Sequence, residues 1–259
     1  MELVYIYHSG FALLGDGYTV IMDYYRDTED KQAEAALRRL MNEQPEEPVV
    51  APEQGKVHDE LLHRPGKLYV LASHFHPDHF NKEVLDWKTQ RPDIIYIFSK
   101  DILVDGKASA TDAVYLNKGE TYQDDLLKIE AFGSTDLGVS FYIEVGGKRI
   151  FHAGDLNNWH WNEESTPQES AEYEDFYLKE LSYLAKNVPL IDMAMFPVDP
   201  RLGKDYMRGA EQLIDYISVK NFAPMHFGIK YDKANAFAAY ARMKDVRFVM
   251  ITKKKFQLL

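Results

Sequence analysis

The chain has 259 residues, of which 46% are hydrophobic and 27% are charged, a composition typical of a globular protein that can bury a large core. Its 30 Lys and Arg against 41 Asp and Glu give a net charge of −11, which disfavours binding to a nucleic acid. The absence of cysteine excludes disulfides, thiolate metal ligands and a cysteine nucleophile, and it fits the reducing cytoplasm.

The N-terminus lacks a basic region followed by an apolar run, so it does not resemble a signal peptide. No stretch approaches the roughly 20 apolar residues that a membrane span requires. We therefore expect a cytoplasmic protein without a membrane partner, whose partner is a small-molecule substrate. The sequence does not indicate an oligomeric state.

Apolar runs predict the first strands over 3–8 and 18–24, with a turn at 15–17 between them. His8 falls where the apolar segments are interrupted, and it is interpreted as a turn histidine bonded to backbone. Asp23 lies near a strand end, where polar site residues are common.

Residues 27–66 differ in character from the rest of the chain. Apolar residues at helical spacing predict an amphipathic helix over about 29–43, and a segment rich in Pro and Glu follows it. We interpret 27–66 as a polar helical insertion in a single domain that spans residues 1–259.

The remaining elements alternate between strands and helices. Strands are predicted over 67–72, 94–98, 114–116, 126–132, 139–145, 148–153, 191–196, 222–228 and 246–251. Helices are predicted over 82–89, 166–187, 207–219 and 232–243, the second of them with Thr166 as N-cap. Two sheets with helices on their outer faces would bury these elements, so we expect a mixed α/β architecture.

A dense group of metal-ligand side chains follows the strand over 67–72. His74, His76, Asp78 and His79 lie within six residues, and imidazole nitrogen and carboxylate oxygen are ligands of Zn²⁺ and related cations. In an extended segment His74 and His76 point to the same side, so both can reach one cation. Asp78 and His79 lie beyond them and can reach a second.

Asp155 and His226 come at the ends of other strands, which suggests one focal site at a sheet edge. Two metals about 3.5–4 Å apart would activate a water molecule at neutral pH, and Asp155 has two oxygens to share between them. We expect one or two divalent ions, with zinc preferred and manganese or iron as alternatives.

The segment 73–79 resembles the H-x-H-x-D-H signature of the metallo-β-lactamase superfamily of metallohydrolases. His8 to Phe11 is similar to the G-H-S/A motif of the branch that includes ascorbate-phosphate lactonases, Gly154-Asp155 to the motif of the bridging Asp, and His226 to the last ligand histidine. The resemblance covers nearly the whole chain. It implies a four-layer αββα sandwich with the metals at one edge of the sheets.

One ligand of the family pattern is missing, because no histidine lies between His79 and His152. Asp136 could replace it, or His160 could swing in, or the metal site of His74 and His76 could be weak. A turn role for Asp136 is about as well supported as a ligand role. His152 lies within a strand and is interpreted as a hydrogen-bonded structural residue.

The loop after Asp155 carries Trp159, His160 and Trp161. We interpret the aromatic residues as a pocket wall over the metals and His160 as a candidate for proton transfer or substrate contact. Asp78 is the other candidate catalytic residue, because it could hold metal or orient the attacking water.

The sequence therefore predicts a metal-dependent hydrolase that uses an activated water on an ester, lactone or phosphodiester of a small molecule. One alternative is a metal-binding or sensing protein with impaired catalysis, suggested by the missing histidine. Another is an iron-dependent oxidoreductase, which is ranked lower because the di-iron relatives carry Glu where this chain has His76.

Overall fold

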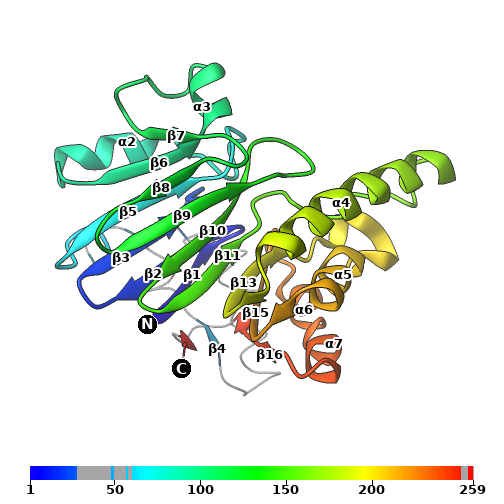
Figure 1. Cartoon of the computed structure of the whole chain (residues 1–259). Coiled ribbons are helices and arrows are strands. Elements are labelled where there is room, and N and C mark those ends of the chain that lie inside the picture. The colour runs from blue at the N-terminus through cyan, green and yellow to red at the C-terminus, as the bar shows by residue number, and fades with distance from the viewer. Residues whose placement is uncertain (28–47, 50–56, 58–59, 252–255, 259) are drawn as a thin grey trace.

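The computed structural model describes residues 1–27, 48–49, 57, 60–251 and 256–258. The helix predicted over 29–43 lies outside these residues, as does most of the segment 27–66. The described chain forms four layers, two central sheets with helices on both outer faces, as expected for the αββα sandwich (Figure 1). None of the described helices is long and apolar enough to cross a membrane.

The first sheet has seven strands in the order β18-β1-β2-β3-β5-β6-β7. The first three strands in the chain pair antiparallel, and β3, β5, β6 and β7 then pair in parallel. The bounds are β1 (Glu2–Tyr7), β2 (Gly10–Gly15), β3 (Tyr18–Met22), β5 (Lys67–Ala72), β6 (Ile95–Ser99), β7 (Val114–Leu116) and β18 (Phe256–Gln257).

The second sheet also has seven strands, in the order β16-β15-β13-β11-β10-β9-β8. Four antiparallel strands are followed by a parallel set, so the two sheets repeat one plan. The bounds are β8 (Thr121–Gln123), β9 (Leu127–Phe132), β10 (Ser140–Val145), β11 (Lys148–His152), β13 (Met193–Pro197), β15 (Asn221–Met225) and β16 (Arg247–Phe248). Two short pairs join β12 (Leu190–Ile191) to β14 (Ser218–Val219) and β4 (Pro48–Val49) to β17 (Met250–Ile251).

Helices cover the outer faces of both sheets (Figure 1). On the first sheet lie α2 (Glu83–Asp86), the 3₁₀ turn η2 (Trp87–Thr89) and α3 (Lys100–Val104). On the second lie α4 (Pro167–Asn187), η3 (Pro200–Asp205), α5 (Arg208–Tyr216), α6 (Tyr231–Asn235) and α7 (Ala238–Met243). The N-terminus of α4 has the predicted cap, because Thr166 and Glu169 form a capping box.

Some predicted boundaries were wrong. The helix over 207–219 ends at Tyr216, because the backbone is extended at Ile217 and the next two residues form β14. The predicted helix over 232–243 is divided into α6 and α7, and the strand over 246–251 into β16 and β17.

The strand sequences are almost continuously apolar because both faces of each sheet are covered. In β1, Leu3 and Tyr5 face the core between the sheets, whereas Val4 and Ile6 face the outer layer. The buried polar side chains therefore lie mostly at or beyond the ends of the strands. Since β1, β3 and β5 run in one direction, as do β11, β13 and β15, each set delivers its following residues to one sheet edge.

Candidate metal centre

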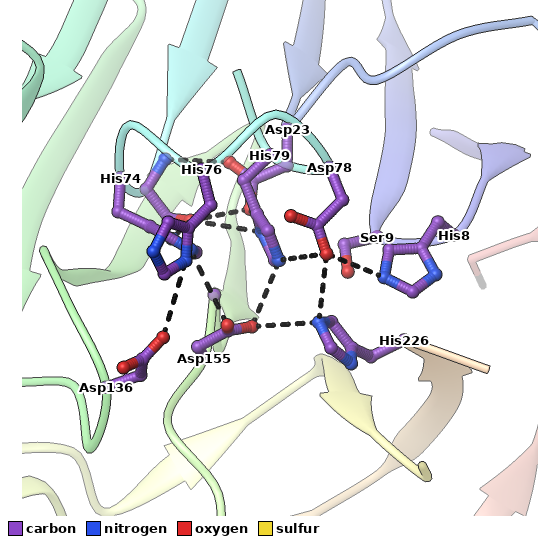
Figure 2. A network of polar contacts seen from close by, with 12 residues as sticks. His8, Ser9, Asp23, His74, His76, Asp78, His79, Asp136, Asp155 and His226 are labelled. Atoms are coloured by element: carbon purple, nitrogen blue, oxygen red, sulfur yellow. Dashed lines mark hydrogen bonds and ion pairs between the residues drawn. The ribbon is translucent and has the colours of Figure 1, made fainter. Parts of the chain in front are cut away.

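Six strand ends deliver His and Asp side chains to one place (Figure 2). From the first sheet come His8 after β1, Asp23 after β3, and the segment 74–79 after β5; from the second come Asp155 after β11, Asp199 after β13 and His226 after β15. The structure thus brings together Asp155, His226 and the His74 segment, which lie up to about 150 positions apart in the chain.

Asp78, His79, Asp155 and His226 form what we call the inner group. Asp155 Oδ1 lies 3.0 Å from His79 Nε2 and 3.3 Å from His226 Nε2. Asp78 Oδ2 lies 3.6 Å from His226 Nε2 and 3.9 Å from His79 Nε2. The two imidazole rings and Asp155 are buried, while the Asp78 side chain is 36% exposed. Two nitrogens and two oxygens therefore face a common point.

His74, His76 and Asp136 form the outer group, which shares Asp155 with the inner one. His74 Nε2 lies 3.5 Å from Asp155 Oδ2 and 3.1 Å from His76 Nδ1. Asp136 Oδ2 lies 3.4 Å from His76 Nδ1. One oxygen of Asp155 faces each group, which is the geometry of a bridging carboxylate between two cations.

Asp136 lies beside His76 in the outer group, and it comes from the part of the chain between His79 and His152 that contains no histidine. It lies in the loop between β9 and β10, and Val139 N–H donates to the Ser73 carbonyl at 2.9 Å to hold that loop against the His74 segment. Gly138, at φ 67°, allows the approach, because a Cβ there would lie 2.0 Å from Ser73 O. The loop chemistry thus places a carboxylate in the outer group.

Two buried carboxylates orient the inner histidines from behind. Asp23 Oδ2 lies 2.7 Å from His79 Nδ1, and Asp23 also accepts from Ser73 N–H and Oγ–H. Asp199 Oδ2 lies 3.0 Å from His226 Nδ1 and is paired with Arg201. A carboxylate at Nδ1 holds the proton there and leaves the lone pair of Nε2 facing the centre, the arrangement seen behind metal-binding histidines.

The side chains of the centre fit a divalent cation. Four buried atoms of the centre have no hydrogen-bond partner among the described residues: His79 Nε2, His226 Nε2 and Asp155 Oδ1, which face one point, and His8 Nε2 beside them. Buried polar atoms are normally paired, so three such atoms facing one point require a further partner. Burial, together with His79, lowers the pKa of His74 to about 3, so its ring is neutral and its nitrogens can bind metal. Burial and Asp155 raise the pKa of Asp136.

A cavity of about 450 Å³ opens onto both groups. Trp159 and Trp161 form one wall with their rings stacked 6.1 Å apart, and Trp159 Nε1–H donates to the Asp155 carbonyl at 2.9 Å. The other lining residues are His76, Asp78, Thr135, Asp136, Asp155, Tyr173, Arg201 and His226. The aromatic residues thus lie where the wall was predicted.

The structure does not bring His160 to the cavity. Its Nε2 lies 3.2 Å from the Asp205 carbonyl, and Asn162 N–H donates to its Nδ1 at 3.2 Å. Both ring nitrogens thus face backbone groups, while the two flanking tryptophans line the cavity. His152 has the structural environment that was predicted, because its Nε2 lies 2.8 Å from the Ser9 carbonyl and Gly154 N–H donates to its Nδ1.

Three residues of the centre were not predicted as site residues. His8, interpreted as a turn histidine, reaches Asp78 with its Nε2 at 3.3 Å from Oδ2, although it does also bond backbone. Asp23 was noted only for its strand end, and Asp199 was overlooked. Their signal in the sequence is the same as for Asp155: a polar side chain directly after an apolar strand.

Comparisons with known proteins identify relatives of this chain. Residues 2–171 match a family model described as the beta-lactamase superfamily domain. A UPF0173 metal-dependent hydrolase from Symbiobacterium thermophilum is 28% identical over 185 residues, which cover 67% of this chain and 73% of that protein.

Two solved structures share the fold. Igni18, a metallo hydrolase from Ignicoccus hospitalis, is 17% identical with a TM-score of 0.65, and the match covers 100% of this chain and 99% of that one. CmlA, a diiron β-hydroxylase from Streptomyces venezuelae, is 13% identical with a TM-score of 0.63, and the match covers 99% of this chain and 54% of that one.

Proposed function

This chain belongs to the metallo-β-lactamase superfamily, and we propose that it is a metal-dependent hydrolase that cleaves an ester, lactone or phosphodiester bond of a small molecule with an activated water. The observation that carries the proposal is the position of Asp155 between the inner and outer groups. One of its oxygens faces the buried Nε2 atoms of His79 and His226 and the other faces His74. No hydrogen bond among the described residues satisfies Asp155 Oδ1 or these two nitrogens.

The ligand set supports two divalent cations, and we propose zinc with manganese or iron as alternatives. The inner group offers two imidazoles and two carboxylates, a set that suits zinc. The outer group of His74, His76, Asp136 and Asp155 has the same number of imidazoles and carboxylates, and such oxygen-containing sets also suit manganese or iron. The identity of the metal is a proposal from donor chemistry.

Cations held by these residues would supply one effect, which is to lower the pKa of a water molecule toward 7. The chain's own residues do the rest. Asp78 lies at the cavity with its Oδ2 directed at the inner histidines, so it can also orient the attacking water. Trp159 and Trp161 exclude solvent from one side and hold the substrate against the centre.

The cavity supports a small-molecule substrate. Its volume of about 450 Å³ lies within the range of roughly 300–1,000 Å³ of small-ligand sites. Arg201 lies at its edge, with Nε and Nη2 donating to Asp199, so the guanidinium is held in a fixed orientation beside the cavity. An oxygen-rich substrate such as a lactone or a phosphodiester offers acceptors for its remaining N–H groups.

Metal analysis tests the first part of the proposal. We expect protein purified without chelators to retain between one and two equivalents of a transition metal, most of it zinc or manganese. Less than about half an equivalent under these conditions would contradict a metalloenzyme.

A substrate screen tests the second part. Nitrophenyl esters, aliphatic lactones and bis(nitrophenyl) phosphate are offered to the protein with added Zn²⁺ or Mn²⁺. We expect turnover of at least one class that is lost in His76→Ala and kept in His63→Ala, an exposed histidine outside the centre. Equal turnover in both variants would contradict the assignment to this site.

Two alternatives have distinct outcomes in these experiments. A metal-binding or sensing protein would bind the cations and turn over none of the substrates. An iron-dependent oxidoreductase is favoured only by the carboxylates of the two groups, because iron also accepts oxygen ligands. It would yield a coloured preparation with iron in place of zinc or manganese.

A further inference from the structure

His8 lies beside the inner group but faces it in a different way from the other histidines (Figure 2). We propose that His8 is a positioning residue whose neutral imidazole donates an Nε2–H hydrogen bond to Asp78 and fixes that carboxylate, and that it is not a further metal ligand. The proposal rests on the proposed function insofar as the inner group binds a cation.

The tautomer of His8 follows from its backbone partner. Gly228 N–H donates to His8 Nδ1 at 3.2 Å, so Nδ1 must carry a lone pair and the proton of the neutral ring lies on Nε2. This Nε2 is buried and forms no hydrogen bond with the described residues, and Asp78 Oδ2 is the carboxylate oxygen near it, at 3.3 Å. A metal bond through Nε2 would need the proton on Nδ1, where it would meet the N–H of Gly228.

The inner histidines have the opposite arrangement. His79 Nδ1 lies against Asp23 and His226 Nδ1 against Asp199, and each carboxylate accepts a proton from Nδ1. Their Nε2 atoms therefore present lone pairs to the centre, as metal ligands must. Arg201 Nη2 also lies 3.2 Å from His226 Nδ1, but Asp199 is closer to that nitrogen at 3.0 Å. Among these three rings only His8 has a backbone N–H and no carboxylate at Nδ1, so we infer that only His8 presents a hydrogen at Nε2.

The backbone fixes His8 in this position. His226 N–H donates to the His8 carbonyl at 3.1 Å, and His8 N–H donates to Tyr5 Oη at 2.8 Å. His8 and His226 both have positive φ, at 56° and 64°, and their rings lie 4.2 Å apart. Residues other than glycine seldom adopt this conformation, and such strain gathers at functional sites.

Asp78 needs such a partner because it is the least enclosed member of the inner group. Its side chain is 36% exposed, whereas His79, His226 and Asp155 are buried. An N–H donor at one side restricts rotation of the carboxylate and directs Oδ2 toward the two histidines. Removing the donor should therefore weaken metal binding through Asp78 alone.

The tautomer can be measured directly by ¹H–¹⁵N correlation of the side-chain nitrogens of His8 in the whole protein, before and after zinc is added. We expect Nε2 to be protonated in both states. An Nδ1–H tautomer in the metal-free protein, or a deprotonated Nε2 after zinc is added, overturns the proposal. The metal-free measurement decides even if the protein binds no zinc, which would contradict the proposed function separately.

A double-mutant cycle tests whether His8 acts through Asp78. We expect His8→Asn, which tolerates the left-handed backbone, to weaken zinc binding at the tighter site by about 10- to 100-fold in a chelator-competition titration. In an Asp78→Asn background the same change should have no further effect. An equal loss in both backgrounds identifies His8 as an independent ligand and overturns the proposal. His63→Asn is the matched control, and the ¹⁵N measurement needs no variant if His8→Asn fails to fold.

Discussion

The inner and outer groups of the metal centre differ in how firmly the fold holds them. Behind the inner histidines lie the buried carboxylates of Asp23 and Asp199. Behind His74 lies the hydroxyl of Ser73, with Oγ 3.0 Å from Nδ1. His76 and Asp136 are 36% and 46% exposed and belong to loops. We therefore expect the two inner histidines to be oriented before a cation arrives, and His76 and Asp136, like the equally exposed Asp78, to become ordered when it binds.

One bridged centre can therefore contain two metal sites of unequal affinity. Preorganised ligands lose less conformational freedom on binding, and partners that orient a ligand contribute about 10- to 100-fold to metal affinity. We therefore expect the inner site to fill first and the outer metal to exchange readily. Four sets of variants test this difference in metal affinity between the two sites, and the variant with the largest expected effect comes first.

Replacing Asp155 should weaken both metal sites, because one of its oxygens faces each group. In Asp155→Asn the bridging charge is lost, and the buried imidazoles lose the carboxylate between them. We expect the metal content to fall below one equivalent and turnover to fall at least about 10³-fold. Elemental analysis and steady-state kinetics measure the two effects. Retention of both metals would show that Asp155 is not a bridge.

Replacing Asp136 should separate the two sites. We expect Asp136→Asn to weaken the outer metal at least about 100-fold, more than the loss of an orienting partner, and to leave the inner metal unchanged. Asp136→His restores the residue type of the family pattern and should tighten the outer site. Zinc titration with a chelating indicator resolves the two affinities.

Asp125→Asn is the matched control for this pair, since Asp125 is an exposed carboxylate at the opposite end of β9. Two affinities that fall together in Asp136→Asn would contradict independent sites. Equal metal binding by Asp136→Asn and Asp125→Asn would show that Asp136 is a turn residue and not a metal ligand.

The four-layer fold and the ligand candidates could be predicted because their signals are local. His74 and Asp155 each follow an apolar strand, and the strand ends of a parallel set meet at one edge. The orienting roles of Asp23 and Asp199 could not be predicted, because they depend on which strand ends become neighbours across the two sheets. That order is a property of long-range pairing, which no local pattern contains.

The direction of individual side chains in loops could not be predicted from the sequence either. His160 lies between two tryptophans that line the cavity, yet its ring nitrogens face backbone groups instead. The backbone conformation of the loop determines where these side chains point. Trp161 has a φ of 42°, so side chains do not simply alternate between two sides here as they do in an extended strand. His8 differs in the same way, since its role depends on Gly228, which is 220 residues away in the chain.

Removing the orienting carboxylates should lower the metal affinity of the inner site toward that of the outer site. In Asp199→Asn and Asp23→Asn the side chain keeps its size but loses the charge that holds the proton on Nδ1 of His226 or His79. We expect each variant to weaken the inner metal by about 10- to 100-fold with little change in the outer one. Zinc titration measures both affinities, and a larger loss at the outer site would contradict the comparison.

The smallest effect is expected at Asp192, a buried carboxylate that lies outside the centre. Arg149 donates to it from the backbone N–H and from Nε, both at 2.9 Å, and Lys220 Nζ lies at 2.8 Å. Burial alone would raise the pKa of Asp192, but the hydrogen bonds from Arg149 and Lys220 outweigh it and lower the pKa to about 2. We expect Asp192→Asn to reduce the free energy of unfolding by about 1–3 kcal/mol at pH 7.

The sign of the pH dependence follows from this lowered pKa. The unfolded chain binds the proton near pH 3.8 and the folded chain only near pH 2, so the stabilisation is complete above pH 3.8 and is lost as the pH falls through 2. Urea unfolding of the wild type and of Asp192→Asn should therefore differ most at neutral pH and converge in acid. Because this carboxylate orients no metal ligand, zinc affinity at both sites should stay unchanged. A fall in inner-site affinity as large as that in Asp199→Asn would mean that general stability, and not orientation, separates the inner group from the outer.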